Sequence, residues 1–434
     1  MQPAAKAAGQ QTGTDVPDDA PACVALPCDF SRRTLPCDFS RRSAGQQTGT
    51  LPLPQYIEQP LSLYVHVPFC QKRCIYCDFA TFTGQEQQMP AYVAAVEREV
   101  GRRAGALGRP PAQTVFFGGG TPSLLPPELL EGLLAALHRH FTLDPRAEIT
   151  LEANPGTLDE ARLRAYRALG INRISFGVQS LNDRKLRLLG RLHSADEALD
   201  AFALARRSGF DNVSGDLIYA LPGQSMADWR DTLVRLLALD LPHLSLYALT
   251  PEEGTPLWHA LERGRLKLPA SDRAAAMYEW ARETLASCGY KHYEISNWAR
   301  PGWESRHNMA YWVQTPYLGF GVAAHGYFAG ERRGNVRGLG AYLRRIESGR
   351  DPAATVEPID AARARSDGMI FGLRVIDGIE RAIFRRQHDA DPLDLWPQEI
   401  ARLCEQGLLS VTPERIALTP RAHLLGNYVW EHFL

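Results

Sequence analysis

The chain has 434 residues, of which 45% are hydrophobic, so it can bury a large core and is expected to form more than one domain. Its 48 Lys and Arg residues nearly balance its 49 Asp and Glu residues, which argues against a nucleic-acid partner bound by bulk electrostatics. The longest apolar stretch, residues 233–250, is interrupted by Arg235, Asp240, Pro242 and His243, so the sequence predicts no membrane span.

Residues 1–57 contain two short duplications. LPCDFSRR occurs at 26–33 and 35–42, and AGQQTGT occurs at 8–14 and 44–50. These segments are rich in Gln, Thr, Gly and Pro and have neither a helical nor a strand period, so we predict a disordered tail. Cys28 and Cys37 lie inside the copies, and duplication explains them more simply than a metal site or a redox pair.

From residue 58, short apolar runs alternate with longer amphipathic stretches. The runs predict strands at 61–67, 114–117, 148–153, 172–178, 212–218 and 244–249. The stretches between them predict helices at 91–104, 127–140, 158–169, 195–208 and 226–239. Six strand–helix units in succession predict an α/β fold, a parallel sheet that curls into a partial (βα)6 TIM-like barrel over residues 58–300. In such barrels the functional residues lie on the loops that follow the strands.

Residues 301–434 have a different pattern, and we assign them to a smaller C-terminal domain. Pro301, Gly302 and Asn308 predict a linker at its start. The later pattern predicts helices at 361–373, 379–387 and 395–406, a hairpin of 408–411 with 416–418, and a last helix from Pro420. This order resembles a winged-helix-like domain, although the near-neutral charge argues against a DNA-binding role.

Cys70, Cys74 and Cys77 form a CxxxCxxC pattern directly after the first predicted strand. A four-iron cluster normally takes four cysteine ligands, so three would leave one iron open to a small molecule. Structural zinc is the less favoured alternative because it prefers two paired units, and no second pair follows. Cys288 and Cys404 lie in helix-like apolar patterns and are interpreted as core residues. Disulfides are disfavoured because the N-terminus lacks the features of a signal peptide, which also predicts a cytoplasmic protein.

Six motifs in order identify the chain as a member of the radical S-adenosylmethionine (SAM) superfamily, within the oxygen-independent coproporphyrinogen III oxidase family. They are YVHVPFC at 64–70, FFGGGTPS at 116–123, EANPG at 152–156, ISFGVQS at 174–180, DLIYALPGQ at 216–224 and HNMAYW at 307–312. The resemblance covers about residues 60–434 and implies a 4Fe-4S cluster on Cys70, Cys74 and Cys77. It further implies that SAM chelates the open iron and that reduction cleaves SAM to a 5′-deoxyadenosyl radical.

The same resemblance implies a set of SAM contacts at the ends of the predicted strands. They are Gly119, Gly120, Thr121, Glu152, Gln179, Arg191 and Asp216. From spacing alone, Glu152 fits a solvent-facing carboxylate equally well, and Arg191 fits an ordinary arginine at an exposed helix end. Tyr64 and Tyr76 flank the cysteines; contact with the cluster or the adenine and a plain role in the core are both open.

Two local features separate two branches of this family. The oxidase pattern has a further cysteine two places after the third, and here that position is Phe79, which puts the decarboxylase activity in doubt and favours the heme chaperone branch. The HNMAYW segment fits the chaperone branch and implies heme binding through His307, since imidazole is an axial ligand of heme iron. Tyr311 and Trp312 are then expected to pack on the porphyrin. From residue chemistry alone, His307 with Asn308 more often forms a hydrogen-bonded structural corner.

The sequence therefore predicts a heme chaperone that binds heme, a 4Fe-4S cluster and SAM, and that transfers heme to acceptor hemoproteins, with respiratory-chain proteins as candidates. The alternative is the oxidase that converts two propionates of coproporphyrinogen III to vinyl groups, so enzymatic activity stays open. The oligomeric state is open as well, a homodimer included. His66 and His325 are interpreted as hydrogen-bonding groups rather than iron ligands.

Overall fold

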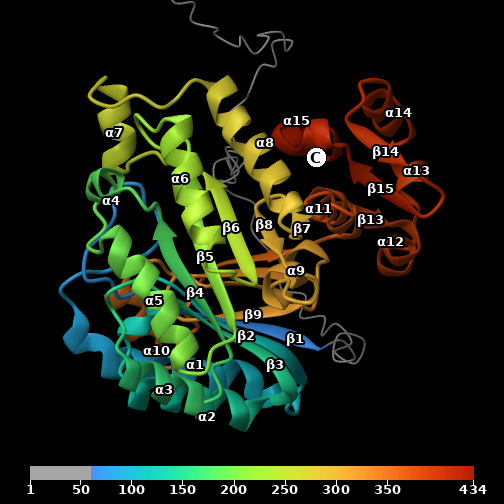
Figure 1. Ribbon diagram of the computed structural model, residues 1–434. Coiled ribbons are helices and arrows are strands. Elements are labelled where there is room, and N and C mark those ends of the chain that lie inside the picture. The colour runs from blue at the N-terminus through green and yellow to red at the C-terminus, as the bar shows by residue number, and fades with distance from the viewer. Residues whose placement is uncertain (1–59) are drawn as a thin grey trace, which may run out of the picture.

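The computed structural model describes residues 60–434, so the predicted tail with its duplications lies outside the described residues (Figure 1). Within this range a 12-stranded sheet has the order β12-β11-β10-β9-β1-β2-β3-β4-β5-β6-β8-β7. Its strands are β1 (Leu61–Val67), β2 (Pro111–Gly119), β3 (Thr142–Ala153), β4 (Arg173–Gln179), β5 (Asn212–Tyr219), β6 (His243–Ala248), β7 (Lys291–Glu294), β8 (Asn297–Ala299), β9 (Tyr317–Phe320), β10 (His325–Phe328), β11 (Glu331–Asn335) and β12 (Ala353–Pro358).

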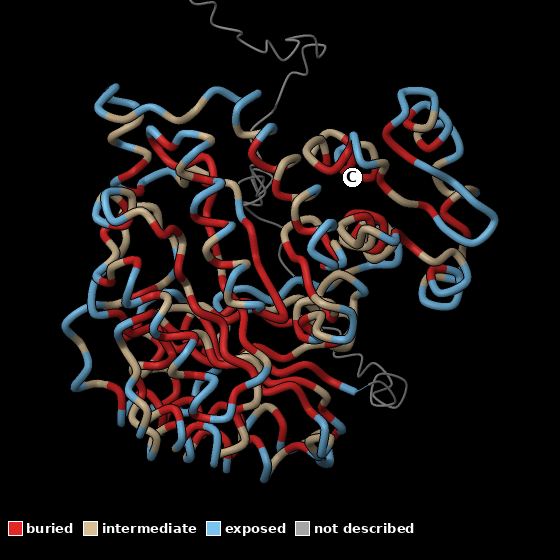
Figure 2. The backbone as a smooth tube through the Cα atoms, viewed as in Figure 1, coloured by how far each residue is buried: buried red, intermediate tan, exposed pale blue. Residues whose placement is uncertain are grey.

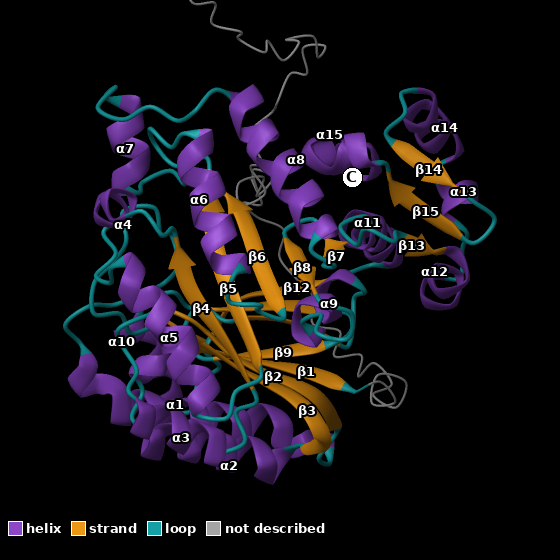
Figure 3. Ribbon diagram, in the orientation of Figure 1, coloured by secondary structure: helices purple, strands orange, loops and turns teal. Residues whose placement is uncertain are grey.

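The first six strands lie in the sheet in chain order, and each pairs in parallel with the next. Right-handed crossovers between such strands place the connecting helices on one face, so the sheet curls with the helices outside (Figure 3). The helices of this part are α1 (Met89–Ala104), α2 (Pro127–His140), α3 (Glu160–Ala168), α4 (Asp183–Leu189), α5 (Ala195–Arg207), α6 (Met226–Leu237), α7 (Pro256–Glu262) and α8 (Ser271–Ser287). The predicted α/β partial barrel is confirmed.

Burial follows the strands, as the tube in Figure 2 shows. On β1, the alternate residues Leu61, Leu63, Val65 and Val67 are all fully buried. Among the helices of residues 60–434, none has both the length and the apolar character that crossing a bilayer requires.

The sheet continues beyond the six strands at both edges. At one edge β9 pairs in parallel with β1, and β10, β11 and β12 follow in antiparallel pairs. At the other edge, β8 and β7 extend β6. The predicted linker is wrong at Asn308, which lies inside α9 (Arg306–Trp312). The Ser305 side chain accepts a hydrogen bond from the Asn308 amide and so caps this helix.

A second, smaller hydrophobic core is built by residues from Met369 to Phe433. It contains a three-stranded sheet in the order β13-β15-β14, and the predicted hairpin is β14 with β15. Its elements are α11 (Ala361–Gly372), α12 (Arg381–His388), α13 (Pro392–Leu395), α14 (Pro397–Glu405), α15 (Gly426–Trp430), β13 (Ile379–Glu380), β14 (Leu409–Val411) and β15 (Arg415–Leu418). The preceding helix α10 (Leu339–Glu347) packs in the large core instead. The strands β9 to β12, within residues 317–358, belong instead to the large sheet. The predicted domain boundary at residue 300 stays a prediction.

A buried carboxylate joins α1 to this extended edge. Glu99 on α1 is fully buried, and its oxygens accept hydrogen bonds from the Gly321 amide at 2.8 Å, Asn335 Nδ2 at 2.8 Å and the Tyr342 hydroxyl at 2.7 Å. Arg103, one helical turn further on, lies 3.2 Å from the same carboxylate. Each oxygen of the Glu99 carboxylate therefore has two partners. Apart from Arg103, these partners come from β11, α10 and the loop after β9.

Replacement of Glu99 with Ala should destabilise the protein by about 3–5 kcal/mol, because the partly buried Arg103 and three hydrogen-bond donors lose their acceptor. Chemical denaturation would measure the change. The matched control is Arg98→Ala, an exposed position on the same helix, which should stay within about 0.5 kcal/mol of the wild type. Equal stability of the two variants would contradict the role of Glu99.

Candidate functional site

A cavity of about 370 Å³ opens where the strands β1 to β6 end, and we call it the cysteine cavity. It brings together Cys70, Cys74, Tyr76, Cys77, Gly119, Gly120, Thr121, Glu152, Gln179, Arg191 and Asp216. These are all of the predicted site residues except Tyr64 and His307. They come from loops far apart in sequence, and they meet because parallel strands end at the same edge of the sheet.

Backbone hydrogen bonds hold the cysteine loop against the loop after β2. The Gly120 amide donates to the Val67 carbonyl and the Thr121 amide to the Phe69 carbonyl, both at 2.8 Å. A Cβ on Gly120 would lie 2.8 Å from these same two carbonyl oxygens, so only glycine fits here. Gly119 has a φ of 111°, and a Cβ there would collide with the ring of His66.

The three thiols lie in a partly buried, polar setting. Thr121 Oγ1 donates to Cys70 Sγ at 3.5 Å, and Arg191 Nη1 donates to Cys74 Sγ at 3.7 Å. Burial, with smaller contributions from the neighbouring Cys74 and Cys70, raises the pKa of Cys77 to about 11. A bound metal would reverse this effect, because a coordinating thiol is deprotonated.

The donor set suits a cluster better than a single ion. Within residues 60–434, no three His, Cys, Asp or Glu side chains converge closely enough to hold one metal ion. A four-iron cluster does not require its cysteine ligands to converge on one point, because each cysteine binds a different iron. Cys70, Cys74 and Cys77 line the same cavity, and so they fit the iron–sulfur group that the motif implies.

Charged side chains also line the cavity, among them the carboxyl groups of Glu152 and Asp216 and the guanidinium of Arg191. Glu152 accepts the Gly119 amide at 3.0 Å, and burial raises the pKa of Glu152 to about 7, with the nearby Asp216 as a smaller cause. Asp216 accepts hydrogen bonds from the Ser175 hydroxyl at 3.0 Å, and burial raises its pKa too. Arg191 donates to Asn154 at 2.6 Å and to the Gly177 carbonyl. These groups suit a ligand that carries both cationic groups and a carboxylate.

Some lining residues were missed by the sequence analysis. Asn154 and Ser175 lie inside the quoted motifs EANPG and ISFGVQS, and Tyr247 is near the end of β6. The rule that functional residues follow barrel strands would have found Asn154, which comes directly after β3, whereas Ser175 and Tyr247 lie within β4 and β6. Gln179, which was predicted, ends β4 with a φ of 66°, an unusual conformation for a residue other than glycine.

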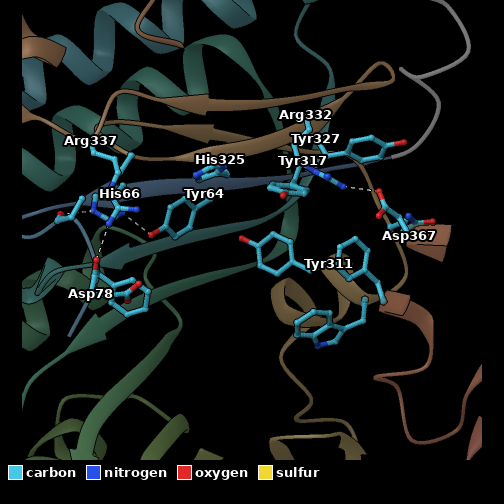
Figure 4. A pocket seen from close by; sticks show the side chains of 16 residues that line it. Tyr64, His66, Asp78, Tyr311, Tyr317, His325, Tyr327, Arg332, Arg337 and Asp367 are labelled. Carbon is cyan, nitrogen blue, oxygen red and sulfur yellow. Dashed lines mark hydrogen bonds and ion pairs between the residues drawn. The ribbon is translucent and has the colours of Figure 1, made fainter. Parts of the chain in front are cut away.

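Tyr64 lines a second cavity of about 500 Å³, which we call the aromatic cavity (Figure 4). Its walls come from β1, α9, β9, β10, β11 and α11. The two cavities share Asp78 and Phe79, the residues that follow the third cysteine. The Tyr64 hydroxyl forms a 2.9 Å hydrogen bond with Nδ1 of His66.

His307 lines neither cavity. It is 1% exposed, its Nδ1 forms a 2.8 Å hydrogen bond with Thr114 Oγ1, and its Nε2 forms one of 2.8 Å with the Tyr311 hydroxyl. Its backbone amide also donates to Glu148. The heme-ligand role of His307 stays a prediction, and iron ligation would require the ring to give up one of these bonds.

Replacement of Gly120 with Ala should sharply lower the iron content of the reconstituted protein, because the new methyl group forces the loops of Cys70 and Thr121 apart. Iron per chain and cluster absorbance measure the effect. Gly105→Ala is the control, since a Cβ at Gly105 meets nothing within 4 Å. Full cluster loading in Gly120→Ala would show that this close approach is not needed.

Comparison with known proteins agrees with this geometry. The profile of the "Radical SAM superfamily" matches residues 64–236, and that of the "HemN C-terminal domain" matches residues 358–425. Among solved structures, the chain is similar to coproporphyrinogen III oxidase (HemN) from Escherichia coli, described as a radical SAM enzyme. The TM-score is 0.77 at 26% identity, over 88% of this chain and 91% of that chain.

Curated relatives are more similar in sequence. The chain is 35% identical to the heme chaperone HemW of Bacillus subtilis over 86% of this chain and 99% of that protein. It is 36% identical to the heme chaperone HemW of Lactococcus lactis over 87% of this chain and 98% of that protein. Such identity over nearly the full length of both relatives shows that the chain belongs to the HemW family of the radical SAM superfamily.

Proposed function

We propose that this protein binds a 4Fe-4S cluster, SAM and heme, and that it transfers heme to acceptor hemoproteins. The observation that carries the proposal is the cysteine cavity, which three thiols line together with Glu152, Asp216 and Arg191. The family adds support, because the relatives in Bacillus subtilis and Lactococcus lactis are named heme chaperones. Heme is the cargo in this proposal, whereas the cluster and SAM are resident cofactors.

The residues of the cysteine cavity divide into two groups by chemistry. Cys70, Cys74 and Cys77 would hold the cluster, and Arg191 would pair with the carboxylate of SAM. Glu152, together with Asp216, would face the cationic groups of SAM. When bound, the cluster and SAM supply one-electron chemistry, and the protein residues hold and orient them.

The oxidase is the second candidate, and the likeness to HemN over 88% of the chain favours it. Against it stands Phe79 at the position where the oxidase pattern has a fourth cysteine. A shared fold does not decide the activity, since function depends on the residues of the site.

An anaerobic assay separates the two candidates. The reconstituted protein is incubated with coproporphyrinogen III, SAM and a reductant, while heme is titrated into a parallel sample and then offered to an apo-hemoprotein. We expect stoichiometric heme binding, transfer to the acceptor, and no protoporphyrinogen. Turnover to protoporphyrinogen that is absent in Cys74→Ser would establish the oxidase instead.

The affinity for SAM should rise by up to about tenfold between pH 6 and pH 8. A carboxyl with a pKa of about 7 is mostly neutral at pH 6 and mostly ionised at pH 8, and only the ionised form attracts the cationic groups of SAM. Calorimetric titration across this range measures the change. The control is Glu152→Gln, which keeps an oxygen that can accept the Gly119 amide but cannot ionise, and its affinity for SAM should not show this rise. Because SAM titrates identically in both experiments, the difference between the two pH profiles isolates the contribution of Glu152. Parallel pH profiles would exclude Glu152 as the cause.

A further inference from the structure

The aromatic cavity has walls that suit a large planar ring. Its aromatic lining comes from several elements, with Tyr64 on β1, Tyr311 and Trp312 on α9, Tyr317 on β9 and Tyr327 on β10. Aromatic rings pack favourably against the face of an extended π system. The volume of about 500 Å³ lies in the range of cofactor-binding pockets. A porphyrin is large, planar and mostly apolar, and so it is complementary to this aromatic lining.

Two histidines line the cavity, and they differ in their hydrogen bonds. His66 is 4% exposed, and both of its ring nitrogens are engaged, by the Tyr64 hydroxyl at 2.9 Å and by the Ala80 carbonyl at 3.0 Å. His325 on β10 is exposed at the cavity, and neither of its ring nitrogens has a hydrogen-bond partner within residues 60–434. Of the two, His325 is the one that can bind a metal without breaking an existing bond.

The surroundings favour the neutral form of the His325 ring, which is the form that binds iron. Partial loss of contact with solvent lowers the pKa of His325, and the guanidinium groups of Arg337 and Arg332 lower it further. Figure 4 shows His325 between these two arginines, on the wall formed by the strands, with Tyr311 on the opposite side.

The two arginines differ in what they can still bind. Arg332 is paired with Asp367 at 2.6 Å and lies 3.6 Å from Glu357. Arg337 donates to the backbone oxygen of Asp78 at 2.8 Å and has no acidic partner within residues 60–434. A guanidinium has five N–H donors, so Arg337 keeps donors free for a carboxylate at the rim of the cavity. Porphyrin propionates are such carboxylates.

We propose that the aromatic cavity is the heme site, with His325 as a ligand of the heme iron and Arg337 as the partner of a propionate. This inference rests on the proposed function, which requires heme binding but does not locate it. It replaces the interpretation of His325 as a hydrogen-bonding group, because the structure gives that ring no partner. The exposure of His325 and Arg337 leaves the site open on one side, so heme can leave for an acceptor without an opening of the barrel.

The test uses the full chain with its reconstituted cluster, titrated with ferric heme and, separately, with metal-free protoporphyrin IX. His325→Gln should weaken ferric heme binding by about tenfold or more and shift the Soret band, while the affinity for protoporphyrin stays within about twofold. Free imidazole should restore the Soret band of His325→Ala. Arg337→Ala should weaken binding of heme but not of its dimethyl ester. His259→Gln, on an exposed histidine of α7, is the control and should match the wild type.

Several outcomes would overturn the assignment. Unchanged ferric heme affinity and spectrum in His325→Gln, with loss in His307→Gln instead, would place the iron on His307 and leave the proposed function intact. Equal loss of ferric heme and protoporphyrin in His325→Gln would mean a change of cavity shape and count against ligation. A wild-type protein that binds no heme would refute the proposed function, and this inference with it. Cluster iron content and the melting temperature show whether each variant is folded.

Discussion

The close contact between the ends of β1 and β2 is the constraint on which both cavities depend. Gly120 and Thr121 donate backbone hydrogen bonds to Val67 and Phe69, and no side chain fits between them. The cysteine loop begins at this contact and is closed again when the Phe82 amide donates to the Pro68 carbonyl at 2.7 Å. Its position is therefore set by backbone bonds at its base, which the sequence motifs on either side provide.

The same strand β1 separates two environments because its side chains alternate in direction. Leu63 and Val65 are buried in the hydrophobic core, whereas Tyr64 and His66 line the aromatic cavity. The cavity exists only because β9 pairs with β1 and carries β10 and β11 beyond it. The buried Glu99 network ties this extension to α1 and so supports one wall of the aromatic cavity.

The sequence was informative where structure follows from local pattern. The bounds of α2 were predicted as observed, and β1 to β6 were each predicted, since apolar periodicity marks both kinds of element. Strands β10 and β11, with the sequences HGYF and ERRGN, have no such pattern, because their pairing partners determine them. The sequence allowed a hydrogen-bonded role for His307, but it gave no sign of the distant partner of its ring. Its partner Thr114 lies 193 residues away, whereas its other partner, Tyr311, is only four residues further along the chain and lies in the same motif.

Phe79 illustrates how one position can serve two sites. The sequence analysis used it only to distinguish two patterns, by the absence of a fourth cysteine. In the structure it is 61% exposed and lines both cavities together with Asp78, whose carbonyl accepts the hydrogen bond of Arg337. The loop that carries the three cysteines therefore ends in a wall of the aromatic cavity. A phenyl ring at this position adds apolar surface next to the aromatic lining, where a thiol would add a reactive polar group. Phenylalanine in place of the fourth cysteine therefore leaves the three cluster cysteines unchanged and alters the surface that a planar apolar ligand would contact.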